Sequence, residues 1–200
     1  GNYIEDKIYF DDYLPKLIKK CLKTEVKPLL ACNGAYVIRF ADKAFTMFLN
    51  NLGITQNKVK KVRIPEKIIR DTNLIKRCIK GVADTDFTLI FTKMCSDKNH
   101  YPRITFAFAS EKLVKDLEKS LRVMGFTLNT QHYFKKDKRG HNCEINYIHL
   151  DGPHNLKRWM KLMGFSNMRI ITRYELWKRK GFLEPRTTLP QRTSQLNWRI

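Results

Sequence analysis

Two carboxylates separated by one residue are the first candidates for chemistry in this chain. Asp84 and Asp86 lie near the end of the segment from Leu74 to Phe87, where a helix C-terminus is expected. The partial negative charge at a helix C-terminus disfavours carboxylates, so a positive charge should compensate them. A divalent cation is the obvious candidate. The residues alone leave open the alternative of a solvated Asp-Thr-Asp turn.

A helix must position these acids, and the sequence predicts both where this helix starts and which residues form its apolar face. Asp71 or Thr72 can cap its first turn. Apolar residues then recur at helical spacing and predict a stripe of Leu74, Ile75, Cys78, Ile79 and Val82. Gly81 lies inside the helix, although glycine there costs about 1 kcal/mol relative to alanine. We therefore expect another backbone to approach the helix closely at Gly81.

The net charge indicates the class of partner. The 200 residues include 39 Lys and Arg against 19 Asp and Glu, a formal net charge of +20. Repulsion among so many positive charges destabilises a compact fold, and such a surplus is usually found where the partner is a polyanion. Nucleic acid is therefore the first partner we expect. Hydrophobic residues at 42% can fill a packed core, which excludes a disordered basic tail.

The remaining composition indicates the compartment. No uncharged apolar run approaches the roughly 18 residues that a membrane span needs, so we expect a soluble protein with no membrane partner. The five cysteines form no CxxC pair, and their odd number favours reduced thiols. No secretory leader pattern opens the sequence, and the expected location is cytoplasmic.

Repeated units of a strand, a helix and a glycine predict the fold. They cover residues 35–53, 103–125 and 144–164, and a further strand and helix are expected at 7–10 and 12–23. Each half of the chain therefore reads β-β-α-β-β-α. We expect an α+β fold of two pseudo-symmetric ββαββα repeats, with antiparallel sheets backed by helices on one face.

Polar side chains that alternate with apolar ones along these strands are candidates for DNA contacts. Arginine, asparagine and glutamine on a strand in a major groove can bond guanine or adenine bidentately. The candidate base contacts are Lys7, Tyr9, Arg39, Thr88, Thr92, Arg103, Thr105, Asn129, Gln131 and Tyr133. A basic hairpin tip suits phosphate contacts and contains Lys135, Lys136, Lys138 and Arg139. Any one of these residues can also be an ordinary solvated side chain.

The acid-bearing segment Cys78-Ile-Lys-Gly-Val-Ala-Asp-Thr-Asp-Phe87 resembles the LAGLIDADG motif of homing endonucleases, particularly its archaeal and intein-type form. Arg63-Ile-Pro-Glu-Lys-Ile68 is similar to the segment that typically precedes the second motif. Tyr101-Pro-Arg-Ile-Thr-Phe106 and Ser110-Glu-Lys-Leu-Val114 look like the strand and helix that follow it, and Leu156–Phe165 fits a late helix of the family. The resemblance covers nearly all of residues 1–175.

The resemblance implies a saddle whose two antiparallel sheets lie in the major groove of double-stranded DNA. It implies that Asp86 binds Mg²⁺ beside a scissile phosphate, which activates water and stabilises the leaving oxygen. Asp84 would be a supporting, structural acid, and Gly81 would let two motif helices pack closely. Lys61 is a candidate catalytic cation, or else part of a phosphate-contacting basic patch, and Arg169 is the analogous candidate in the second half.

Two features depart from the family pattern. Phe87 stands where the motif usually has glycine, which could alter the backbone beside the metal. Residues Asn2–Phe10 match the first hairpin after a motif, so the first half lacks its own motif helix. A truncated chain, a homodimer in which the Asp86 helix pairs with its copy, and a decayed relative that binds without cutting all fit this pattern. An unpaired helix would leave an apolar patch exposed.

The predicted organisation has four segments. They are a first repeat at 1–57 without its motif helix, a basic linker at 58–71, a second repeat at 72–175 with its motif at 78–87, and a basic C-terminal tail at 176–200. The expected function is that of a site-specific double-stranded DNA endonuclease that uses Mg²⁺. The alternative is a catalytically inactive DNA- or RNA-binding protein of the same fold, such as a maturase or a regulator.

Overall fold

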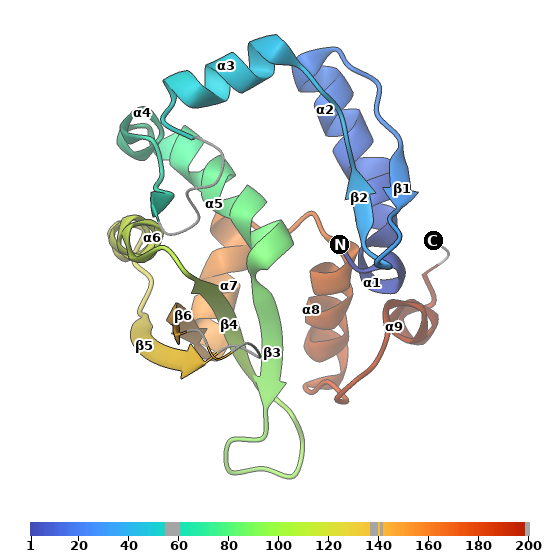
Figure 1. Ribbon diagram of the computed structural model, residues 1–200. Helices are drawn as coiled ribbons and strands as arrows, with labels where there is room; N and C mark the ends of the chain where they lie inside the picture. Colours follow the sequence, from blue (N-terminus) through green and yellow to red (C-terminus); the bar gives the residue numbers. More distant parts are fainter. Residues whose placement is uncertain (55–60, 137–139, 141, 199–200) are drawn as a thin grey trace. The chain divides into compact units, whose positions relative to one another are not determined.

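The computed structural model describes residues 1–54, 61–136, 140 and 142–198 (Figure 1). The chain divides into two units by its internal packing. Unit 1 contains residues 1–47, 93–100 and 165–200, and unit 2 contains residues 48–92 and 101–164. The α+β class predicted from the sequence is confirmed.

Unit 2 is built on an antiparallel sheet in the strand order β3-β4-β6-β5. Its strands are β3 (Thr88–Thr92), β4 (Tyr101–Phe108), β5 (Asn129–Lys136) and β6 (Asn142–Asp151). One face is apolar, and its residues Leu89, Ile104, Phe106, Ile148 and Leu150 are at most 1% exposed. Helices α6 (Glu111–Val123) and α7 (Gly152–Leu162) pack on the sheet and bury Leu117, Leu121, Leu156 and Trp159. The β-β-α-β-β-α order predicted for the second repeat is confirmed.

The helix that carries the two acids is α5 (Thr72–Asp86). As predicted, Asp71 caps it, because its carboxylate accepts hydrogen bonds from the backbone N–H groups of Asn73 at 2.8 Å and Leu74 at 2.9 Å. The short helix α4 (Glu66–Arg70) precedes it within the expected linker. Helix α5 therefore starts where a side-chain cap satisfies its first free N–H groups.

Unit 1 begins with helices, so the strand predicted at residues 7–10 and the hairpin predicted at Asn2–Phe10 are wrong. Helix α1 (Tyr3–Ile8), the π-helical turn η1 (Tyr9–Tyr13) and helix α2 (Leu14–Leu22) follow one another. The Asn2 side chain caps α1 by accepting hydrogen bonds from the backbone N–H groups of Ile4 and Glu5, and the acidic residues Glu5 and Asp6 lie in the first turn. Acidic residues there stabilise the helix, and this local signal outweighs the alternation that suggested a strand.

A small hairpin and a helix complete the first half. Strands β1 (Pro28–Leu30) and β2 (Tyr36–Ile38) pair antiparallel. Helix α3 (Lys43–Asn51) follows and leads to Gly53, whose φ of +80° is the left-handed conformation expected after a helix. The predicted strand-helix-glycine unit at residues 35–53 is confirmed. The first half as a whole is helix-hairpin-helix, however, and not β-β-α-β-β-α.

The C-terminal residues form two helices in unit 1. Helix α8 (Met168–Lys180) packs on α9 (Leu189–Leu196), so the boundary expected between residues 175 and 176 falls inside α8. Arg192 on α9 is fully buried and donates hydrogen bonds to Thr172 Oγ1 at 2.9 Å and Glu5 Oε2 at 2.6 Å. The tail is therefore folded, because a buried arginine requires such partners. In the part of the chain that the structure describes, no helix has the length and apolar character needed to cross a bilayer.

Candidate nucleic-acid interface

A row of polar side chains crosses all four strands of unit 2. Thr88 lies opposite Thr105, Thr105 opposite His149, and His149 opposite Asn129. Directly opposed residues share one face of a sheet, so these four side chains stand side by side. The Thr105 hydroxyl and His149 Nδ1 are hydrogen-bonded at 3.0 Å. The row forms one continuous strip of hydrogen-bonding groups.

Neighbouring rows extend this strip in both directions. On one side, Arg103 lies opposite Asp151, and its Nε donates a hydrogen bond to the Asp151 carboxylate. On the other side, Gln131 lies opposite Tyr147. The Tyr133 hydroxyl donates a hydrogen bond to Gln131 Oε1 at 2.8 Å. This bond fixes the orientation of the Gln131 amide, so its two N–H groups can donate to other partners. The Tyr133 ring also contacts Tyr147 edge-on at 5.5 Å.

The set of face residues, which we call the polar sheet face, is opposite the helix-covered face. Thr88, Asn129 and Tyr133 are exposed, and Arg103, Thr105 and Gln131 are half-buried. Most of the predicted base contacts lie here: Thr88, Thr92, Arg103, Thr105, Asn129, Gln131 and Tyr133. Lys135 and Lys136 are the last two residues of β5, where their backbones pair with Cys143 and Asn142. Lys138 and Arg139 lie outside the described residues.

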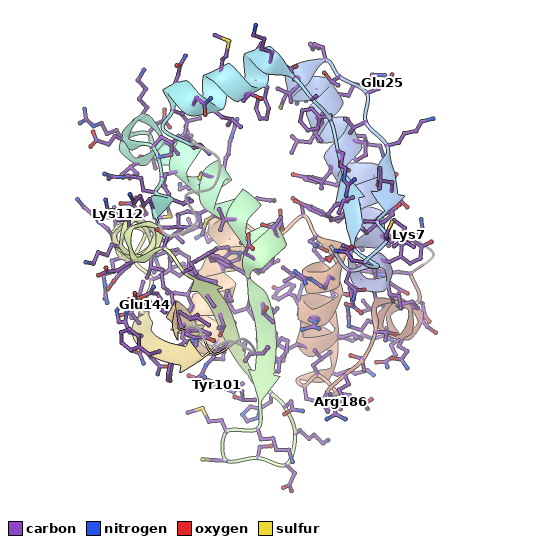
Figure 2. All side chains as sticks on the ribbon, in the orientation of Figure 1. Lys7, Glu25, Tyr101, Lys112, Glu144 and Arg186 are labelled. Carbon is purple, nitrogen blue, oxygen red and sulfur yellow. The ribbon has the colours of Figure 1, made fainter. Side chains whose placement is uncertain are left out.

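Three predicted DNA contacts lie elsewhere. Lys7 is on helix α1 of unit 1 (Figure 2) and forms an ion pair with Asp11. Tyr9 is buried, and its ring stacks on Tyr13 with centroids 5.2 Å apart. Lys7 lies in α1 and Tyr9 begins η1, so the prediction that they belong to a strand face is wrong. Arg39 follows β2 in unit 1 and is exposed.

Sequence reasoning missed three members of the polar sheet face. Tyr147, His149 and Asp151 alternate along β6 with the buried Ile148 and Leu150. That alternation was visible in the sequence and could have identified them. Burial, together with the nearby positive charge of Arg103, lowers the pKa of His149 below its ordinary value, although Asp151 opposes this effect. The imidazole is therefore mostly neutral at pH 7 and can both donate and accept hydrogen bonds.

The two acids of the motif have different environments. Asp86, the last residue of α5, is exposed, and the Thr85 hydroxyl donates to its Oδ2 at 2.7 Å. Asp84 is only 1% exposed, which fits its predicted structural role. Asp86 precedes Thr88 by two residues, and Thr88 is both the first residue of β3 and a member of the central polar row. The turn from α5 into β3 thus joins the acid to the polar sheet face.

Gly81 and Phe87 differ from what the motif suggested. A side chain at Gly81 would meet nothing within 4 Å, so the close backbone approach expected there is not present in the described chain. Phe87 has an ordinary extended backbone with φ of −84°, and its ring is buried on Phe106. Glycine is therefore not needed at position 87, because neither φ nor space demands it. Phe87 anchors the end of α5 instead of disturbing it.

The residues around Asp86 could hold a metal ion only if a bound substrate supplied some of its ligands. No group of three or more His, Cys, Asp or Glu side chains placed to hold a metal occurs among residues with described positions. Mg²⁺, however, is commonly bound by one or two carboxylates together with waters and substrate phosphate oxygens. Asp86 alone fits that arrangement and does not fit a structural metal centre.

The two predicted auxiliary cations have separate surroundings. Lys61 is exposed in unit 2. Arg169 lies in unit 1, where its Nε is 3.4 Å from a carboxylate oxygen of the buried Asp6. Asn167 Nδ2 donates to the same oxygen at 2.9 Å. The Asp6 cluster gives Arg169 a structural role that sequence reasoning did not anticipate.

No family model matches the chain, and no curated protein matches it.

Proposed function

We propose that the polar sheet face of unit 2 binds double-stranded DNA in the major groove, and that Asp86 holds Mg²⁺ for phosphodiester hydrolysis. The central row of Thr88, Thr105, His149 and Asn129 carries this proposal. The activity is the one that the LAGLIDADG resemblance implies. The protein would accordingly be a site-specific endonuclease.

The chemistry of the polar sheet face supports base readout. The major groove presents hydrogen-bond donors, acceptors and thymine methyl groups in a distinct pattern for each base pair. Neutral hydroxyl and amide groups on the sheet can match that pattern, and Arg103 can bond guanine while Asp151 holds its Nε. The net charge of +20 supplies the sequence-independent attraction to phosphates. Readout and attraction thus come from different residues.

The end of α5 supports the catalytic part of the proposal. A bound Mg²⁺ would supply Lewis-acid stabilisation and a water of lowered pKa. Asp86 would provide the protein carboxylate, and the Thr85 hydroxyl would hold one of its oxygens in place. Phe87 fixes the backbone next to Asp86 by its burial against Phe106. These residues orient one carboxylate toward solvent at the start of β3.

Cutting both strands requires two such acids, and α5 has an open face where a second copy could pack. Leu74 is 45% exposed, and a Cβ added at Gly81 would meet nothing within 4 Å beyond its chain neighbours and the helix's own backbone. Small residues allow close helix approach. A homodimer through α5 would bring two Asp86 side chains together. Analytical ultracentrifugation of the protein bound to a duplex tests this, since a homodimer predicts two protein chains on each duplex.

The experiment for the binding step compares two arginines in unit 2. Arg103→Ala removes a cation from the polar sheet face, whereas Arg122→Ala removes one from α6, where it pairs with Glu118. Duplex affinity is measured by fluorescence anisotropy over a range of salt concentrations. We expect Arg103→Ala to weaken binding by about 1–3 kcal/mol and to relax the preference for guanine among duplexes that differ at one base pair, with Arg122→Ala close to wild type. Equal effects of the two variants would contradict the proposed surface.

A second candidate function is a DNA- or RNA-binding protein of this fold without catalysis. The observation that favours it is that the described residues contain no group of three or more His, Cys, Asp or Glu side chains placed to hold a metal ion. The two functions share the binding surface and differ only in cleavage.

A further inference from the structure

Helix α7 carries a row of basic side chains on the side that faces away from the sheet of unit 2. The helix packs against β4 and β6 (Figure 1), and its Leu156 and Trp159 are at most 1% exposed. Residues at three- and four-residue spacing share one side of a helix. Such residues line a surface cavity of about 310 Å³, and they are His154, Lys157, Arg158 and Lys161, with Leu162 beside them. We call the first four the α7 basic row.

The α7 basic row has no acidic counterpart in its surroundings. Helix α7 contains no Asp or Glu, and no acid is among the described residues that line the cavity. The nearest acid along the chain, Asp151, pairs instead with Arg103 on the polar sheet face. Helix α6 differs, because Lys115 pairs there with Glu111 at 2.6 Å. Like charges at helical spacing repel one another, so the row is unfavourable unless an anion binds it.

Arg158 is held in place by the end of α6. Its Nη1 donates a hydrogen bond to Met124 O at 3.1 Å. Gly125 makes room for the guanidinium, because a Cβ added there would lie 2.6 Å from Nη1. Arg158 Nε is buried and has no hydrogen-bond partner among the described residues. A guanidinium that is already positioned, with donor capacity unused, suits the planar oxygen pattern of a phosphate.

The α7 basic row suits the successive phosphates of a duplex better than a single phosphate ion. Lys157 and Lys161 are exposed and lie about one helical turn apart, roughly 6 Å along the axis. Cations spread along a helix can follow a chain of charges, whereas one phosphate requires donors that converge on a point. Single strands are held mainly by bases that stack on aromatic rings, and no aromatic residue is among the described lining residues. A duplex therefore fits the row best, because its backbone presents a continuous line of phosphates.

We infer that the α7 basic row binds the phosphate backbone of a second DNA duplex, separate from the duplex at the polar sheet face. Helix α7 covers the apolar face of the sheet, and the row lies on the far side of that helix, so the sheet and the helix separate the two duplexes. Phosphate contacts carry no sequence information, so the second duplex is bound whatever its sequence. This site is independent of the polar sheet face and of cleavage.

Lysine acetylation of the full chain, with and without a DNA duplex of mixed sequence, locates the contact. Acetic anhydride modifies exposed lysines, and mass spectrometry measures the extent of modification at each one. We expect the duplex to protect Lys157 and Lys161. Lys115 and Lys119, exposed lysines at the same spacing on α6, should be modified as in the free protein. Protection of Lys157 and Lys161 no greater than that of Lys115 and Lys119 would overturn the inference.

The protection of Lys161, followed as the duplex concentration rises, gives an affinity for the α7 basic row alone. Lys157→Gln should weaken this affinity and reduce its salt slope by about 1, because one phosphate contact is lost. Lys115→Gln removes the same charge from α6 and should leave the affinity at Lys161 unchanged. Equal effects of the two variants would show that only the total charge matters, and the inference would then be wrong.

Two more arms test the ligand and the separation from the polar sheet face. Inorganic phosphate in place of the duplex should leave Lys157 and Lys161 unprotected, and protection equal to that by the duplex would contradict a backbone contact. Arg103→Ala should leave the affinity at Lys161 unchanged, and loss of protection in this variant would contradict a separate second duplex. A failure of the proposed function is distinguishable, because Arg103→Ala would then leave all duplex binding unchanged while Lys157→Gln still weakened the contact at Lys161.

Discussion

The Phe87 ring stacks on the Phe106 ring with centroids 3.8 Å apart and an angle of 8° between their planes. Phe87 directly follows the last residue of α5, and Phe106 is a central residue of β4. The Trp159 ring of α7 lies 5.4 Å from Phe87. This cluster joins α5, the sheet and α7, and it fixes the backbone that carries Asp86.

Removal of the Phe87 ring should destabilise the fold strongly. We expect Phe87→Ala to lower the free energy of unfolding by about 3–5 kcal/mol, because it removes contacts and leaves a cavity in the core. Phe134→Ala is the control, since Phe134 is 82% exposed, and it should cost less than about 1 kcal/mol. Denaturant titration followed by circular dichroism measures both. Similar losses for the two variants would show that the Phe87–Phe106 contact does not hold the end of α5.

Asp84 and Asp86 should separate into a structural acid and a functional one. Asp84 is buried, so Asp84→Ala should lower the free energy of unfolding by about 1–3 kcal/mol, because it disrupts the surroundings of a buried polar group. Asp86 is exposed, and Asp86→Ala should change the stability by less than about 0.5 kcal/mol. Thermal and denaturant unfolding of both variants provide the comparison. A larger loss for Asp86→Ala would reverse the assignment of the two roles.

Arg192 should be essential to the C-terminal helices of unit 1. Its side chain is fully buried beside Glu5 and Thr172, so Arg192→Met leaves a carboxylate without its cation. The expected loss of stability is about 3–5 kcal/mol, as for other broken buried ion pairs. Lys178→Met, at an exposed position on α8, removes the same charge and should be nearly neutral. Limited proteolysis should cut the Arg192→Met protein within residues 181–198 while Lys178→Met resists, and equal resistance of both would contradict the role of Arg192.

The lowered pKa of His149 predicts a loss of stability in mild acid. The unfolded chain protonates this imidazole as the pH falls through its ordinary value of 6.5, whereas the folded protein resists protonation until lower pH. The unfolded state therefore binds more protons below pH 6.5, and the free energy of unfolding falls. His149→Gln should remove this part of the pH dependence. Unfolding titrations from about pH 8 to about pH 5 measure it, and a stability difference between the two proteins that is independent of pH would contradict the shift.

The second half of the chain was largely predictable because its signals are local and agree with one another. Alternation along β3, β4 and β6 identifies the buried face, and the cap at Asp71 identifies the start of α5. The strand register could not be read, because it depends on which residues pair across the sheet. The rows that join Thr105 to His149 and Arg103 to Asp151 therefore emerge only from the structure.

The first half shows where local patterns compete. Residues 7–10 alternate like a strand, but the Asn2 cap and the acids that follow it start a helix instead. Whether the tail is folded could not be read from the sequence for a related reason. Its Thr188-Leu-Pro-Gln191 sequence forms a capping box that starts α9, and the buried Arg192 pairs with Glu5 at the other end of the sequence. Partners so distant along the chain leave no periodic pattern.

Mg²⁺-dependent cleavage of a randomised duplex library by the wild-type chain and by Asp86→Asn tests the central proposal most directly. We predict that the wild type cuts a defined subset of duplexes in Mg²⁺. Asp86→Asn should bind the same duplexes with the same salt dependence and cut none of them. Binding by the wild type without any cleavage would favour the non-catalytic alternative, and cleavage that persists in Asp86→Asn would contradict the assignment of the metal to Asp86.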